Sequence, residues 1–159
     1  MALVRPAHTS DAGRIAELLC QLGYNAAPDL IERKLAALER SPMDAVLVVG
    51  DEITVVGVAS LHVLELFHAE GWLGRITSLV VDAASRGKGV GKLRVEAADN
   101  HFVCAQCVRA EVTSGSHRRE AHAFYEAQGY KADERRFLKR YDLTGHSSGA
   151  TSAPTEFQR

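Results

Sequence analysis

The apolar positions in the first half of the chain change from a helical to an extended spacing. A stripe at i, i+3, i+4 and i+7 that begins at Ile15 predicts a helix ending at Gly23. Pro28 suits the first turn of a second helix. Gly57 interrupts an apolar run, which indicates a bulge or the close approach of another backbone. Apolar runs predict strands at residues 2–6, 45–49 and 53–66.

The second half of the chain alternates in the same way. A β-rich run ends at Asp82, and a helix is predicted from about 89 to 105. We expect the inner stripe of that helix to be Val90, Leu93, Ala97, His101 and Cys104. The remaining pattern predicts a strand at 108–112, a helix at 117–128 stopped by Gly129, a closing strand at 131–141 and a polar tail at 144–159.

This order of elements mixes hairpins with crossover helices. It predicts an α/β (α+β) fold, with a mixed, mostly antiparallel sheet flanked by helices on both faces. We expect a single domain over residues 1–143, followed by the tail at 144–159.

Composition narrows the class of protein and its partners. The 159 residues carry a formal net charge of −1, so no basic field favours nucleic acid or a membrane surface. No apolar run approaches the roughly 18 residues of a membrane span, and the N-terminal residues lack the apolar region of a signal peptide. We therefore expect a cytoplasmic protein. We interpret Cys104 and Cys107 as small apolar residues at a helix–strand junction, because no second ligand pair follows, and we expect no metal.

A glycine-rich segment, Arg86–Gly91, follows the run that ends at Asp82 and precedes a predicted helix. Alternating glycines allow a backbone to turn its N–H groups inward, and a helix N-terminus adds a positive dipole end, so the segment is suited to a phosphate. The segment lacks the Gly-Lys-Ser/Thr of a P-loop, because Leu93 follows Lys92. Its glycines also lack the spacing of a dinucleotide fingerprint.

The remaining pattern, Arg-x-x-Gly-x-Gly between a strand and a helix, resembles motif A of the GNAT superfamily of acetyl-CoA-dependent N-acetyltransferases. AHAFYEAQGY resembles the late helix of that family, and LLCQLGY resembles a segment near its first helix. The three matches occur in the family's order and span residues 3–141. The resemblance implies the GNAT fold, acetyl-CoA as co-substrate and, by analogy, a homodimer.

The resemblance also implies roles for particular residues. Leu79 and Val81, on either side of Val80, would pair with the pantetheine arm, and the Leu79 N–H would polarise the thioester carbonyl. Tyr125 matches the tyrosine that protonates the departing thiolate, although packing within its helix is an alternative role. The pyrophosphate would be held by Arg86, Gly87, Lys88, Gly89, Val90, Gly91 and Lys92.

The base that accepts the amine proton is left open. Several small-molecule members carry an acidic residue two positions before the first pantetheine contact, and this chain has Thr77 there. The candidates are His117, Glu111, His62 or a chain of water molecules. We select His117 because the positive end of a helix dipole would favour a neutral imidazole, which can accept a proton.

These features predict an enzyme that moves an acetyl group from acetyl-CoA to the primary amine of a small molecule, without an acyl-enzyme. A peptide or protein N-acetyltransferase and a non-catalytic acyl-CoA-binding module are alternatives, and a nucleotide-binding protein is a more distant one. We expect the acceptor pocket to lie at 23–29 and 64–74, the segments with the least regular pattern.

Overall fold

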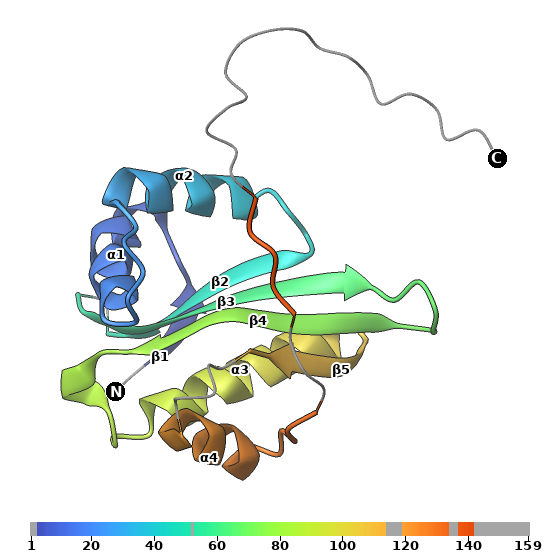
Figure 1. Cartoon of the computed structure of the whole chain (residues 1–159). Helices are drawn as coiled ribbons and strands as arrows, with labels where there is room; N and C mark the ends of the chain where they lie inside the picture. The colour runs from blue at the N-terminus through green and yellow to red at the C-terminus, as the bar shows by residue number, and fades with distance from the viewer. Residues whose placement is uncertain (1–2, 52, 114–118, 134–136, 142–159) are drawn as a thin grey trace, which may run out of the picture.

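The computed structural model describes residues 3–51, 53–113, 119–133 and 137–141. Within these residues one sheet runs through the middle of the molecule, and its strands lie in sequence order (Figure 1). Neighbouring strands are antiparallel up to β4, whereas β5 is parallel to β4. The strands are β1 (Leu3–Pro6), β2 (Asp44–Gly50), β3 (Val55–Glu65), β4 (Trp72–Val81) and β5 (Cys107–Val112). The predicted mixed, mostly antiparallel sheet is confirmed.

Helices lie on both sides of this sheet (Figure 1). One side carries α1 (Ala12–Cys20), which the 3₁₀ turn η1 (Thr9–Asp11) precedes, and α2 (Pro28–Leu38). The other side carries α3 (Val90–Cys104) and α4 (Arg119–Ala127). We call these the α1/α2 face and the α3 face. Gly23 and Gly129 each follow a helix, and both have a φ of 88°, as expected for a glycine that ends a helix.

Each face of the sheet has its own apolar core. On the α1/α2 face, Leu18 of α1 packs with Val58 of β3 and Val80 of β4. On the α3 face, Leu61 of β3 packs with Ala98 and Phe102 of α3. The two sets alternate along β3 because successive side chains of a strand point to opposite faces.

The inner stripe predicted for α3 was wrong except for Val90. The buried residues of the helix are Val90, Arg94, Val95, Ala98 and Phe102, whereas Leu93 is 39% exposed. The true stripe lies one position beyond the predicted one, because the aliphatic stem of Arg94 is buried in place of the side chain of Leu93.

The closing strand predicted at 131–141 was also wrong. The described residues 131–133 and 137–141 form no strand, and Phe137 and Tyr141 are 92% and 73% exposed. An alternating pattern becomes a strand only where a neighbouring strand completes its ladder, and no described strand pairs with this segment. The predicted tail at 144–159 lies outside the described residues. None of the described helices is long and apolar enough to cross a membrane.

Candidate active site

Strand β4 changes its partners half-way along its length. Between Trp72 and Ile76 it pairs with β3 on one side and with β5 on the other. From Ser78 to Val81, only β3 pairs with it among the described strands. Among the described strands, the second half of β4 therefore has one open edge.

The hydrogen-bond pattern shows which residues face that edge. Just beyond β4, the Asp82 N–H donates to the Val56 carbonyl at 2.8 Å, so Asp82 faces β3. Facing alternates along an antiparallel strand, so Val80 also faces β3, and Leu79 and Val81 direct their N–H and C=O groups toward the open edge. These are the two residues for which the resemblance implied pairing with pantetheine.

A β-bulge lies at the start of this open segment. Ser60 of β3 pairs with Ser78, and the next residue, Leu61, pairs with Ile76. Thr77 is therefore the extra residue of β4. A bulge re-aims the side chains around it, and this one occurs directly after the last pair between β4 and β5, Ile76 with Val112.

The glycine-rich segment joins the end of β4 to α3. Gly87 and Gly89 have φ of 75° and 78°, which other L-residues rarely adopt, and Gly89 is the N-cap of α3. Gly91 has a different role, because a Cβ there would lie 3.1 Å from the ring of Phe124. Together with the N-terminal N–H groups and dipole of α3, this loop is suited to an anion such as a phosphate.

Helix α1 anchors the start of the same loop. Arg14 forms an ion pair with Asp82 and donates from Nε to the Val55 carbonyl at 3.0 Å. Gln21 accepts from the Ala83 N–H at 2.9 Å. The Ala84 N–H and Arg14 both bond the Asp82 carboxylate, so the pKa of Asp82 lies below its ordinary value. The loop is thus held in place by side chains from the α1/α2 face.

Arg94 supports the open segment from the α3 face. Its Nη1 donates to the carbonyls of Val58 (2.9 Å) and Val80, which are register partners in β3 and β4. Burial lowers the pKa of Arg94 to about 10, and Tyr125 acts in the opposite direction. The position of Gly57 was a sequence signal for this contact, because a Cβ there would lie 3.1 Å from Arg94 Cδ. The predicted close approach of a backbone at Gly57 is confirmed by the Val80 carbonyl oxygen, which would also lie 3.1 Å from that Cβ.

Tyr125 projects from α4 and is half-buried. Its ring packs edge-on against Phe124 and Tyr130, at centroid distances of 5.3 and 5.9 Å. Tyr130 in turn donates to Asp99 at 3.2 Å. The packing role considered for Tyr125 is therefore present.

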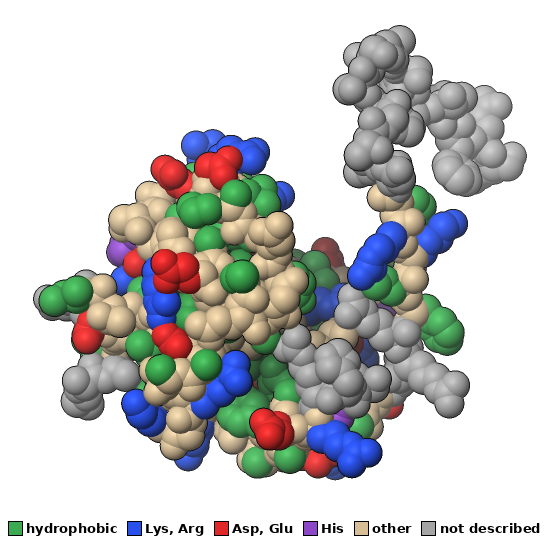
Figure 2. All heavy atoms as spheres, turned by 60° about the vertical axis from the view of Figure 1, so that its left-hand side comes forward, with side chains coloured by type: hydrophobic (Ala, Val, Ile, Leu, Met, Phe, Trp, Pro, Cys, Tyr) green, Lys and Arg blue, Asp and Glu red, His purple; other side chains and the backbone are tan. Residues whose placement is uncertain are grey.

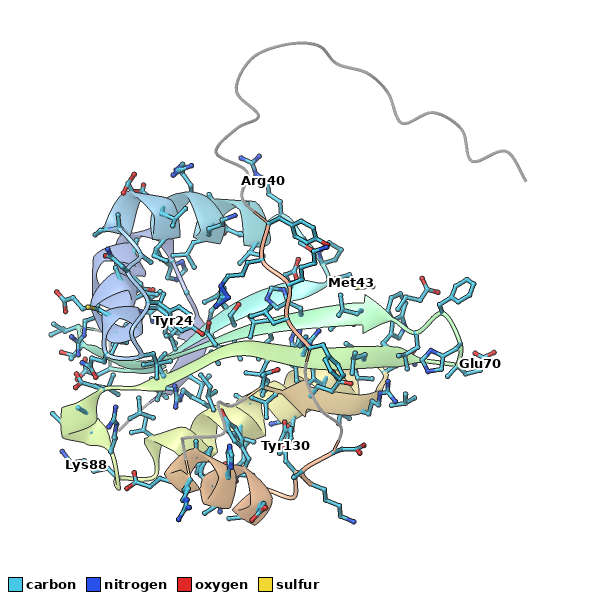
Figure 3. The ribbon with its side chains drawn as sticks, in the orientation of Figure 1. Tyr24, Arg40, Met43, Glu70, Lys88 and Tyr130 are labelled. Atoms are coloured by element: carbon cyan, nitrogen blue, oxygen red, sulfur yellow. The ribbon has the colours of Figure 1, made fainter. Side chains whose placement is uncertain are left out.

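A polar cluster lies on the α1/α2 face, beyond the apolar core. His62 of β3 approaches Asp44 of β2 through Nδ1 at 2.5 Å, and Thr77 through Nε2 at 2.9 Å. Ser60 lies 3.3 Å from the same Nε2. Burial alone would raise the pKa of Asp44, but hydrogen bonds from Ser41 and His62 outweigh it and lower the pKa. In Figure 3, Met43, the neighbour of Asp44, lies far along the sheet from Lys88 of the glycine loop. Tyr24 lies on the α1/α2 side of the sheet.

The structure separates the candidate bases. His62 lies beside Thr77, whereas Glu111 is a half-exposed residue of β5 that pairs with Arg75 at 4.0 Å and Arg109 at 3.8 Å. His117 lies outside the described residues. Nothing in the sequence indicated that Asp44, 18 residues before His62, would be its partner.

The basic residues of the loop are exposed. Arg86 and Lys88 lie at the surface, and Lys92 pairs with Glu96 at 3.7 Å within α3. Figure 2 shows basic and acidic side chains interspersed over the face that carries α1. The described cysteines are free, and no three His, Cys, Asp or Glu side chains in the described part of the chain gather as a metal site.

Comparison with known sequences settles the family. The profile described as "Acetyltransferase (GNAT) family" matches residues 14–130. The chain belongs to the GNAT acetyltransferase family. An aminoalkylphosphonate N-acetyltransferase of Salmonella typhimurium is 31% identical over 141 residues, which cover 86% of this chain and 89% of that protein. This GNAT chain is accordingly an acyl-CoA-dependent acetyltransferase, and acetyl-CoA is the donor that its family uses.

Solved structures agree on the GNAT fold. The glucosamine-6-phosphate N-acetyltransferase of Arabidopsis thaliana superimposes with a TM-score of 0.78 at 24% identity, over 89% of this chain and 99% of that one. An aminoglycoside N-acetyltransferase, AAC(6')-Iy, in complex with CoA, has a TM-score of 0.77 at 14% identity, over 89% and 95% of the two chains.

Proposed function

We propose that this GNAT enzyme transfers an acetyl group from acetyl-CoA to the primary amine of a small molecule. The observation that carries the proposal is the open edge of β4, where Leu79 and Val81 direct backbone groups outward, next to the loop at Gly87–Gly89. An extended pantetheine arm can add to such an edge as a further strand while its pyrophosphate enters the loop at Arg86–Lys92.

The reaction is a direct attack of the amine on the thioester carbonyl. The Leu79 N–H donates to the oxygen that becomes negative in the tetrahedral intermediate, and one such donor is worth about 3 kcal/mol of barrier. When the C–S bond breaks, Tyr125 donates its phenolic proton to the departing thiolate. No cysteine takes part, because the amine itself is the nucleophile.

The related Salmonella protein suggests the first acceptors to test. Its name specifies aminoalkylphosphonates, small molecules that combine a primary amine with an anionic group. We infer that the acceptor of this chain belongs to the wider class of small primary amines. It would approach from the α1/α2 face, past the connection at 23–29 that carries Tyr24.

The test is an acceptor screen that detects the thiol of released CoA. The panel comprises aminoalkylphosphonates, amino sugars, polyamines and a lysine-containing peptide, and calorimetry measures acetyl-CoA binding in parallel. We expect release with at least one small amine. Release with the peptide alone would contradict the proposal and favour a protein acetyltransferase, and binding without release would indicate a non-catalytic module.

Tyr125→Phe tests the acid assigned to Tyr125. We expect kcat to fall about 100-fold or more while the Kd for acetyl-CoA stays unchanged, because only the leaving-group proton is lost. Tyr130→Phe is the matched control, since its hydroxyl bonds Asp99 rather than the open segment of β4, and it should leave kcat near the parent value. Equal kcat values for the two variants would assign Tyr125 to packing alone.

A further inference from the structure

Three strands contribute to one hydrogen-bonded chain on the α1/α2 face. Asp44 Oδ1 of β2 lies 2.5 Å from His62 Nδ1 of β3, and His62 Nε2 lies 2.9 Å from Thr77 Oγ1 of β4. An aspartate bonded to Nδ1 holds the proton on that nitrogen and leaves the Nε2 lone pair free to accept one. The imidazole is therefore oriented as a proton acceptor whose accepting nitrogen faces β4.

This chain of hydrogen-bonded side chains ends at the segment of β4 that would hold the thioester. Thr77 is the bulge residue, two positions before Leu79, whose N–H faces the open edge. The side chains of His62 and Asp44 are 25% and 22% exposed, so they are partly shielded but can still exchange protons with solvent. Val58 and Val80 are buried in the apolar core of this face, and His62 and Asp44 lie beyond that core.

We propose that His62 accepts the proton that the acceptor amine loses, that the Thr77 hydroxyl relays it, and that Asp44 positions the imidazole. This inference rests on the proposed function. It assigns to a histidine of β3 the task that an acidic residue at position 77 would otherwise perform, and it replaces His117 as our assignment.

The proton balance is complete. As the amine nitrogen forms its bond to the carbonyl carbon, its proton passes to Thr77 Oγ1, whose own proton moves to His62 Nε2. The C–S bond then breaks with its electron pair on sulfur, and the thiolate takes a proton from Tyr125. His62 releases its proton to solvent, and Tyr125 regains one. The sum is an amide, CoA thiol and, from an ammonium substrate, one proton in solution.

The charges around the imidazole fit this cycle. The Asp44 carboxylate of β2 stabilises the imidazolium that forms, and hydrogen bonds keep its pKa below the ordinary value, so it is ionised at neutral pH. Arg75, the register partner of His62 on β4, is the cation placed opposite, and it pairs with Glu111 of β5 at 4.0 Å.

The experiment measures kcat/KM against pH for the parent and for His62→Gln, with acetyl-CoA and the best amine from the screen. We expect the variant to lose about 10²–10⁴-fold at neutral pH. The loss should shrink in acid, because there the parent also loses its proton acceptor. Asp44→Asn should lose less and shift the acid limb of the profile. Acetyl-CoA affinity and Tm should stay near the parent values, because these residues lie outside the cofactor loop and both cores.

Three further variants test the relay and the surroundings of His62. Thr77→Val removes the hydroxyl and should lower kcat, whereas Thr77→Ser keeps it and should remain close to the parent. Ser60→Ala, which removes the more distant contact to the same Nε2, should leave both the rate and the pH profile unchanged.

The outcomes separate this inference from the proposed function. Transfer by the parent with an unchanged rate and pH profile in His62→Gln would overturn the role of His62 alone. A loss of the same factor at every pH, together with a lower Tm, would also overturn it, in favour of a structural role. Equal rates for Thr77→Val and Thr77→Ser would overturn the relay. If the parent acetylates no amine, both the function and the inference fail.

Discussion

The two faces of β3 differ although they alternate residue by residue along one strand. Toward α3, the strand presents Ala59, Leu61 and Val63, which are 0–5% exposed. Toward α1 and α2, it presents buried Val58 and then half-buried Ser60 and His62. The α3 face is apolar over this whole stretch, whereas the apolar cover of the other face ends half-way.

This difference assigns separate tasks to the two faces. A strand with one continuous apolar face keeps its register, because a slip of one residue would move every buried side chain to the opposite face. The other face can then carry polar groups at fixed positions, as it does with His62. With the role proposed for His62, stability and chemistry are placed one residue apart, and substitutions at Leu61 and His62 should separate them.

The largest effect on stability is expected for Leu61→Ala. Leu61 is fully buried on the α3 face, and truncation of such a leucine costs about 2–5 kcal/mol through lost burial and the cavity left behind. Urea unfolding measures the loss, and kcat per folded molecule and its pH profile should stay near the parent values. If His62→Gln lowered the unfolding free energy as much as Leu61→Ala, the separation between the faces would be contradicted.

Gly57→Ala should have an intermediate effect. A Cβ at Gly57 would lie 3.1 Å from both Arg94 Cδ and the Val80 carbonyl oxygen, and the backbone oxygen cannot move aside. We expect a loss of about 1–3 kcal/mol in the free energy of unfolding, as for other overpacked sites. Gly13→Ala is the matched control, because nothing lies within 4 Å of the added atom. Equal losses in the two variants would show that Arg94 and β4 accommodate the methyl group.

Asp11→Asn tests the ion pair that joins β1 to the turn η1 before α1, and it should have the smallest effect on stability. Arg5 donates to both oxygens of Asp11, at 2.7 and 2.9 Å, and this hydrogen bonding lowers the pKa of Asp11 below its ordinary 3.8. We expect a loss of about 1 kcal/mol at neutral pH, measured by urea unfolding.

The sign of the pH dependence follows from the lowered pKa. The stabilisation by Asp11 is fully present above the pKa of the unfolded chain and is lost as the pH falls through the lower pKa of the folded protein. The difference between the parent and Asp11→Asn should therefore disappear in acid. A difference that persisted at low pH would contradict a charge-based role for the pair.

Much of the fold could be predicted from local patterns. The helix that starts at Pro28, the strand that ends just before Asp82 and the helix that follows Gly89 all lie where the spacing of apolar residues placed them. Local rules failed in α3, where Arg94 is buried. The glycine at position 57 of β3 leaves room for the aliphatic part of this side chain, and two backbone carbonyls accept hydrogen bonds from its Nη1. They failed again at 137–141, because a strand needs a partner that is remote in sequence.

The sequence by itself determined the order of elements as far as α4, the glycine loop between β4 and α3, and the family to which the chain belongs. These follow from residues close together in the chain, where backbone freedom and side-chain period act directly. Only the tertiary structure decided which residues meet Thr77. Asp44 and His62 come from two further strands, and the register of β2, β3 and β4, set by the burial of their apolar faces, brings them together.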